Sequence, residues 1–173
     1  MRFELQQVLD SLSSALQQEG LSVCPSMPSV LTSRPSTLAA AIGLGSGESR
    51  DSALYRYLGQ ETDPETQATR ELYGLLLSLQ LSIDLYAPPS LGSAGCETAL
   101  RLLHQAVISR LPSGLRVQSL SWDSVRWVDS LRLFHRPVTL SCQALFLASQ
   151  SEDDEHFRDF FLKGVVSHSQ SSS

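Results

Sequence analysis

Hydrophobic and polar residues alternate over one long segment near the middle of the chain, from Leu75 to Tyr86. The odd positions are apolar and comprise Leu75, Leu77, Leu79, Leu81, Ile83 and Leu85. Polar residues hold the even positions Ser78, Gln80, Ser82 and Asp84. A period of two is typical of a strand with one buried face. At about 3.3 Å per residue the segment reaches roughly 40 Å, about twice a typical strand, so part of it is expected to extend beyond the compact core.

Two other segments carry apolar residues at helical spacing. In residues 3–18 these are Leu5, Val8, Leu9, Leu12, Ala15 and Leu16, and Gly20 follows as a stop signal. In residues 93–111 they are Cys96, Ala99, Leu100, Leu103, Val107 and Leu111. Ser93 is the candidate N-cap of this second helix, which ends before Pro112. We expect the second helix to cover the leucine face of the long strand.

Turn-forming residues predict the connections between these elements. Three prolines indicate an irregular connector over residues 23–37. A short strand is expected from Thr37 to Leu44, and GLGSGESRD at residues 43–51 is typical of a turn. A further strand is expected from Ser52 to Gly59, followed by a polar loop from Gln60 to Thr69.

Three more strands are predicted after the second helix, over residues 115–120, 125–133 and 138–148. Pro137 indicates an edge position or a bulge. Helices and strands without regular βαβ alternation predict an α+β fold, with a mixed or antiparallel sheet and two main helices packed on one face. Residues 1–148 are expected to form a single domain, and residues 149–173 an acidic and aromatic C-terminal arm with a frayed polar tail.

Composition disfavours several classes of function. The net charge is −5, and one lysine beside twelve arginines provides no basic stripe for a phosphate backbone. We therefore expect no nucleic-acid-specific binding. No segment approaches the roughly 18 consecutive apolar residues of a membrane span, and polar residues interrupt the N-terminal segment where an export signal would be apolar. We expect a soluble protein that does not contact membranes.

The sequence offers no recognisable catalytic, cofactor or metal site. In the glycine cluster that starts at Gly43, Glu48 stands where a dinucleotide fingerprint needs its third glycine. No serine has the flanking glycines of a nucleophile elbow. The histidines lack metal-binding spacing; they are His104, His135, His156 and His168. The cysteines are expected to be reduced; they are Cys24, Cys96 and Cys142.

Two groups of residues are candidates for a subunit interface instead. The first is the polar face of the long strand, formed by Ser78, Gln80, Ser82 and Asp84. The second comprises the phenylalanines of the C-terminal arm, Phe157, Phe160 and Phe161. These phenylalanines require burial, either because the arm folds back onto its own core or because it docks on a neighbouring subunit.

The order of elements resembles that of bacteriophage tail terminator or tail-completion proteins, which also occur in phage-derived contractile particles. The resemblance covers residues 1–148. It rests on the first amphipathic helix, a tyrosine-bearing segment, ELYGLLLSLQLSIDLYAPP, the helix ETALRLLHQAVISRL and strands ending in VTLSCQALFLA.

This resemblance implies a small structural subunit that is not an enzyme and needs no cofactor. It implies a homo-oligomeric ring, a hexamer by analogy with the family, that caps the tail tube and contacts tube, sheath or neck proteins. The expected location is the virion, in the tail or at the tail–head junction, after assembly in the host cytoplasm.

Two other functions stay open at the level of sequence. One is a different neck or baseplate component of a phage or contractile injection particle with the same α+β build. The other is a small-molecule-binding α+β domain whose site is assembled from scattered residues such as His104, Asp84 and Tyr86.

Overall fold

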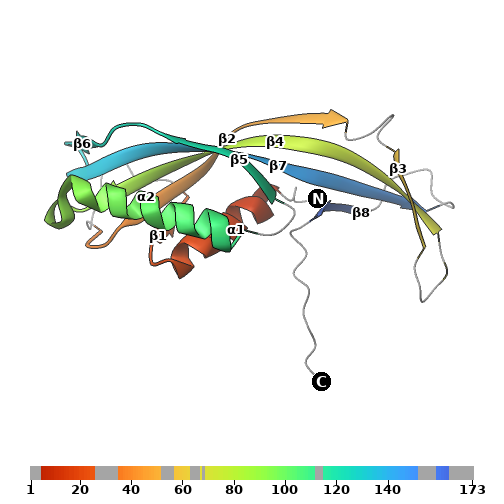
Figure 1. Ribbon diagram of the computed structural model, residues 1–173, viewed down its shortest axis with the longest axis horizontal. Helices are drawn as coiled ribbons and strands as arrows, with labels where there is room; N and C mark the ends of the chain where they lie inside the picture. The colour runs from red at the N-terminus through yellow and green to blue at the C-terminus, as the bar shows by residue number, and fades with distance from the viewer. Residues whose placement is uncertain are drawn as a thin grey trace, which may run out of the picture.

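The computed structural model describes residues 5–25, 35–51, 57–62, 67, 69–111, 115–151 and 159–163. It confirms an α+β fold in which two helices cover one face of a mixed sheet (Figure 1). The elements are α1 (Leu5–Gln18), β1 (Ser22–Cys24), β2 (Ala39–Asp51), β3 (Tyr57–Thr62), β4 (Thr69–Ala87), the 3-10 turn η2 (Pro89–Leu91), α2 (Gly92–Ser109), β5 (Leu115–Trp122), β6 (Arg126–Val128), β7 (Leu133–Ser151) and β8 (Asp159–Lys163).

Strands β4 and β7 form the centre of the sheet. They pair antiparallel along almost their whole length, from Arg70 opposite Ser151 to Ala87 opposite Phe134. The main strand order is β1-β2-β4-β7-β5, and the parallel pair β1 and β2 makes the sheet mixed. β3 follows β2 along the outer edge of β4, whereas β6, β5 and β8 lie in succession along the outer edge of β7.

The core lies between the helices and the apolar face of β4. From Leu79 to Leu85 the odd-numbered side chains are at most 3% exposed. α1 contributes Val8, Leu12, Ala15 and Leu16, and α2 contributes Cys96, Ala99, Leu100, Leu103 and Ala106. The prediction that the second helix covers the leucine face is therefore confirmed.

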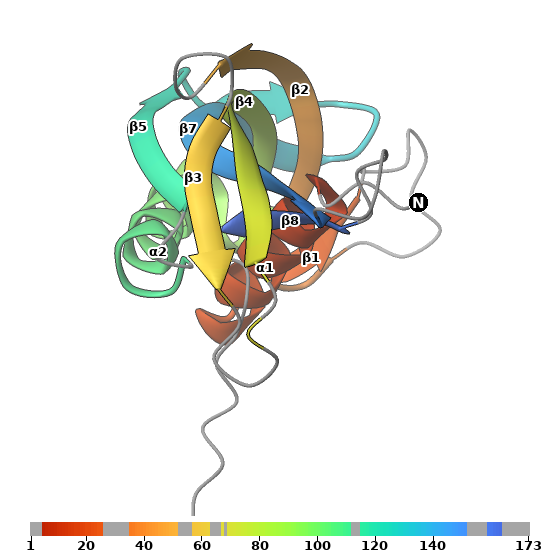
Figure 2. The same ribbon diagram turned by 90° about the vertical axis from the view of Figure 1, so that its right-hand side faces the viewer.

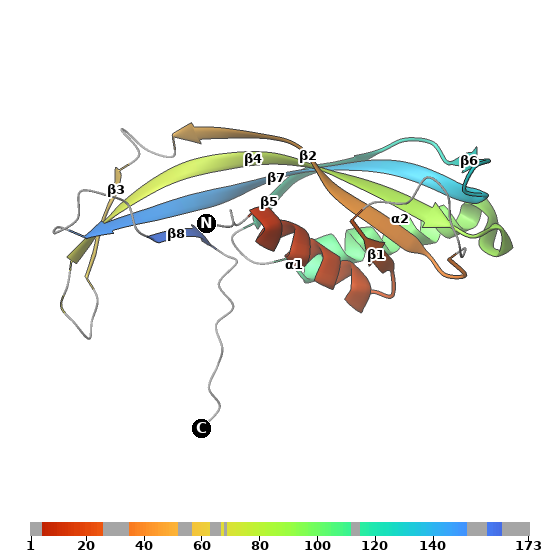
Figure 3. The same cartoon turned by 180° about the vertical axis from the view of Figure 1, so that it is seen from behind.

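The central strands continue past the helices. Figures 1 and 3 show both helices beneath one half of the sheet, and Figure 2 looks at the opposite end, where β3 and the beginning of β4 lie in front. We call β3, β8, residues 69–77 of β4 and residues 145–151 of β7 the distal extension. Here β4 loses its alternation, because Leu72 and Leu76 lie on one face and Leu75 and Leu77 on the other. All four leucines are only partly buried.

The predicted turn over residues 43–51 is wrong, since this glycine-rich segment is the second half of β2. Its glycines lie close to β4: a Cβ at Gly43 would stand 3.1 Å from the Ser82 hydroxyl, and a Cβ at Gly45 would stand 3.1 Å from the Gln80 carbonyl oxygen. A bulge lies between Leu44 and Ser46. Glycine permits this close approach and this bulge, so strand pairing overrides the turn propensity of the sequence.

Several boundaries differ from the sequence prediction. β3 includes Gln60–Thr62, which was expected to be loop, and β1 occupies the start of the predicted connector. α2 begins at Gly92 with Leu91 as its N-cap, so Ser93 is not the cap. The strand expected over 125–133 is instead the short β6 followed by a turn at 129–132. Residues 26–34, 52–56 and 63–66 lie outside the described residues.

Pro137 lies in the central strand β7, so the expectation of an edge strand or a bulge is wrong. Its neighbours on one side, β5 and β6, are interrupted at residues 123–125, and the Asp123 N–H donates to the Pro137 carbonyl at 3.0 Å. In an antiparallel pair the N–H and C=O of a residue point to the same neighbour. The ring nitrogen of Pro137, which carries no hydrogen, therefore faces this interruption, where no strand needs a hydrogen-bond donor.

Part of the predicted C-terminal arm joins the sheet. β7 continues across position 149 to Ser151, and β8 pairs antiparallel with it, placing Phe160 opposite Ala148 and Phe161 opposite Leu147. Of the two alternatives for the arm, the β8 segment therefore follows the first: its backbone folds back onto the chain's own sheet. Phe157 lies outside the described residues.

Candidate functional site

The sheet face opposite the helices, which we call the open face, carries short polar side chains in rows across four strands. The register aligns Ser46, Gln80, Ser141 and Ser119 in one row. A second row holds Glu48, Ser78, Gln143 and Arg116, and a third holds Gly43, Ser82, Thr139 and Ser121. The hydroxyl and amide groups of this face, with the charged Glu48 and Arg116, offer hydrogen bonds to a partner surface.

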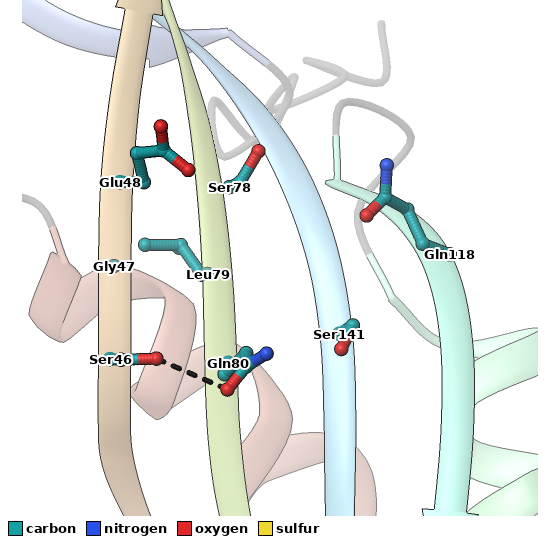
Figure 4. A pocket seen from close by; sticks show the side chains of 8 residues that line it. All are labelled: Ser46, Gly47, Glu48, Ser78, Leu79, Gln80, Gln118 and Ser141. Carbon is teal, nitrogen blue, oxygen red and sulfur yellow. Dashed lines mark hydrogen bonds between the residues drawn. The ribbon is translucent and has the colours of Figure 1, made fainter.

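Hydrogen bonds between neighbouring strands fix some of these side chains. The Ser46 hydroxyl donates to Gln80 Oε1 at 3.1 Å, as Figure 4 shows. The Gln143 amide donates to the Ser78 hydroxyl at 3.4 Å, and the Ser82 hydroxyl donates to the Gly43 carbonyl at 3.3 Å. The polar groups of the open face are therefore partly ordered before any partner binds.

A depression of about 180 Å³ lies in the middle of the open face (Figure 4). Its lining comprises Ser46, Gly47, Glu48, Ser78, Leu79, Gln80, Gln118 and Ser141. Glu48 supplies the only carboxylate of this lining, and hydroxyls and amides supply the other polar side chains. The lining holds no histidine, cysteine or second carboxylate for acid–base chemistry.

A second polar cluster lies at the end of the open face away from the distal extension. It surrounds His135, which is 7% exposed. Its Nε2 lies 2.6 Å from Asp84 Oδ1, and Arg126 Nε donates to its Nδ1 at 3.4 Å. The tautomer protonated at Nε2 satisfies both contacts. Through these contacts His135 of β7 links Asp84 of β4 and Arg126 of β6.

Tyr86 stacks on the same imidazole, with ring centroids 4.9 Å apart and an interplanar angle of 22°. Burial raises the pKa of Tyr86 to about 12, and the neighbouring Asp84 carboxylate adds to the effect by repelling a phenolate. Tyr86 also packs in a small apolar cluster with Ala39, Ala41, Leu131 and Leu133. Its ring therefore helps to close this end of the sheet.

His104 lies on the other side of the sheet, in α2. Its Nδ1 is 2.9 Å from the Leu100 carbonyl, and its ring meets Trp122 edge to face at 5.4 Å. The structure thus brings Asp84 and Tyr86 together with His135, and it separates them from His104. A small-molecule site assembled from His104, Asp84 and Tyr86 is not formed in this arrangement.

The four predicted interface residues of β4 all belong to the open face. Gln80 and Ser82 are exposed, whereas Ser78 and Asp84 are half-buried. Sequence reasoning missed Ser46 and Glu48 in the adjacent strand, because their segment was interpreted as a turn. The near-alternation of glycine with other residues along 43–47 is the signal that marks a strand with close backbone approach.

No protein-family model matches the chain, and no curated protein sequence matches it significantly. Among the described residues, no three histidine, cysteine, aspartate or glutamate side chains gather closely enough to hold a metal ion. Neither described helix combines the length and the apolar character that a membrane span requires. The cysteines Cys24, Cys96 and Cys142 are free thiols.

Proposed function

We propose that this chain is a structural subunit of a phage tail or of a related contractile particle. Its copies assemble into a ring, a hexamer by analogy with tail terminator proteins, that caps the tail tube and joins it to the sheath or neck. The chain acts through its surfaces and is not an enzyme. Its proposed location is the tail–head junction.

The observation that carries this proposal is the distal extension. Leucines on both faces of a strand are typical of a strand that is covered on both sides. Along residues 72–77 of β4 all four leucines are only partly buried: Leu75 and Leu77 pack against the core beneath the sheet, whereas Leu72 and Leu76 lie on the opposite face. Figures 1 and 3 show α1 and α2 beneath the other half of the sheet. A second copy or a tail protein would supply the missing cover, as expected of an assembling subunit.

The open face supports the same proposal. Its hydroxyl and amide side chains are suited to hydrogen bonding across an interface. The sequence prediction of a subunit contact through Ser78, Gln80, Ser82 and Asp84 stands as part of this proposal. The predicted contact through Phe157, Phe160 and Phe161 also stays a prediction.

The test is to delete the gene from its phage or particle and to examine the products by electron microscopy. We expect tails of irregular length or tails that fail to join their heads, and labelled protein at the tail–head junction of normal particles. Wild-type protein supplied from a plasmid should restore uniform tails. Tails of unchanged length and normal joining would refute the proposal, and label at the baseplate would assign the chain to that structure instead.

A further inference from the structure

A seam runs along the side of the molecule where α2 meets the β5 and β6 edge of the sheet. Along α2, residues Glu97, Arg101, His104 and Ile108 recur every three or four positions and form one stripe. Glu97 accepts hydrogen bonds from Arg136 of β7, and His104 contacts Trp122 of β5. These contacts show that the stripe faces this edge.

The seam exposes large apolar side chains. Ile108 is 83% exposed, Trp122 is 48% exposed and Trp127 is 40% exposed. Arg101, in the same α2 stripe as Ile108, is also exposed. Tryptophan and arginine are the residues that most often dominate binding energy at protein interfaces, so this combination is typical of a docking surface.

The backbone of β5 adds to the seam. β5 is the last strand of the main sheet order, and among the described residues no strand pairs with its outer edge. An unpaired edge presents backbone N–H and C=O groups that another strand can complete. The seam therefore fits a partner that supplies an extended segment with apolar and acidic side chains.

Such a segment exists in the chain itself, at β3. This strand pairs with the outer edge of β4, on the opposite side of the sheet from β5. Tyr57 is 42% exposed and Leu58 is 39% exposed, and Glu61 is exposed on the same strand. Among the described residues β3 pairs with β4 alone, so its other edge is also open to a partner.

Charge is complementary between the two surfaces. The seam presents the exposed Arg101 on the α2 stripe, whereas the buried Arg136 beneath it is paired with Glu97. β3 presents the exposed Glu61. In a chain of net charge −5, this asymmetry favours contact between the two regions of different copies and disfavours contact between like regions.

We propose that the α2–β5 seam of one copy binds the β3 edge of the next copy. The inference rests on the proposed ring and names the two surfaces that build it. They are different surfaces on opposite edges of the sheet, so the contact is heterologous, and such contacts propagate until they close into a ring. The open face is left available on every subunit.

Two one-sided variants test this contact. The seam variant carries Arg101→Glu and Trp122→Ser, and the edge variant carries Tyr57→Ser and Glu61→Arg. Each keeps one surface intact, so each alone should fall to the mass of the 18.9 kDa monomer in sedimentation or mass photometry. An equimolar mixture should form a one-to-one heterodimer that grows no further, because only one productive contact can form.

Controls separate loss of contact from loss of fold. Thr98→Glu adds a negative charge to α2 outside the stripe and should leave self-association as in wild type, and Arg101→Glu alone covers the case in which Trp122→Ser unfolds. Wild-type-like association of either one-sided variant, a mixture that stays monomeric, or a monomeric wild-type chain would overturn the contact. Those outcomes leave the deletion phenotype unaffected, so they are distinguishable from failure of the tail function itself.

Discussion

At the residue scale, the buried polar groups of this protein link one element to another. Arg136, 7% exposed on β7, donates from Nη1 to Glu97 of α2 at 3.0 Å and from Nη2 to the second oxygen of the same carboxylate. His135, its neighbour in sequence, points to the open face and joins β7 to Asp84 of β4. Successive residues of β7 therefore hold the helix on one face and the central strand pair on the other.

The burial of Tyr86 predicts a loss of stability at alkaline pH. An unfolded tyrosine titrates near 10, whereas the pKa of Tyr86 in the folded chain is about 12. Between these values the unfolded chain releases a proton that the folded chain retains, so ionisation favours unfolding. The contribution of protonated Tyr86 to the free energy of unfolding is fully present below pH 10 and is lost as the pH rises through about 12.

Urea unfolding at successive pH values from neutral to alkaline measures this effect. Tyr86→Phe should flatten the fall in unfolding free energy above pH 10. The fall that begins near pH 9 should remain, because burial also raises the pKa of the Cys142 thiol to about 11. Equal slopes for wild type and Tyr86→Phe above pH 10 would contradict the assignment to Tyr86.

At the scale of elements, local periodicity decided what the sequence could predict. α1, α2 and most of β4 were predictable because each carries its own apolar pattern. The alternation along β4 also predicted which residues form its polar face. The start of β2 lies in the strand predicted over Thr37–Leu44, but residues 45–51 were not predictable as strand, because their glycines favour turns and only pairing with β4 makes them a strand. The Asp84–His135 contact was also unpredictable, since its residues lie 51 positions apart and meet only through the β4–β7 register.

Close packing of α2 on the sheet predicts that Gly95→Ala is destabilising. A Cβ at Gly95 would lie 2.6 Å from the Ala87 Cβ and 2.9 Å from the Leu91 Cβ, and neither atom can rotate away. Alanine gains about 1 kcal/mol over glycine in a helix interior, but overpacking typically costs about 1–3 kcal/mol. We expect a net loss of about 1 kcal/mol in urea unfolding.

Ser93→Ala is the matched control for that substitution. Ser93 is exposed in the same helical turn and is not the N-cap, so its replacement should change the unfolding free energy by less than about 0.5 kcal/mol. A Gly95→Ala variant as stable as wild type would show that α2 can shift away from β4 without loss.

At the scale of the whole molecule, the elongated sheet separates three surfaces. The open face lies opposite the helices, the distal extension lies past them, and the seam runs along the edge where α2 meets β5 and β6 (Figures 1 and 3). Glu61 on β3 and Arg101 on the seam give the two edges of the sheet opposite charges. Such polarity suits heterologous assembly, and it leaves the open face to be tested separately.

A charge placed on the open face tests whether that face is buried in the assembled particle. Charge reversal at Asp84 is a poor probe, because Asp84 also contacts His135 within the monomer. Gln80 is exposed and accepts a hydrogen bond from Ser46 at the surface, so Gln80→Arg should leave the monomer folded. An unpaired charge buried at an interface costs about 2–5 kcal/mol, so we expect at least a roughly tenfold weaker assembly in mass photometry.

Gln17→Arg, on the exposed side of α1, adds the same charge away from the open face and should assemble like wild type. Thermal unfolding of both variants checks that the monomer is intact. If Gln80→Arg assembles normally while the seam and edge variants do not, the ring is built through the sheet edges and the polar face of β4 does not contact a neighbouring subunit. If Gln80→Arg alone fails, the contact lies on the open face, as the alternation along Leu75–Tyr86 predicts.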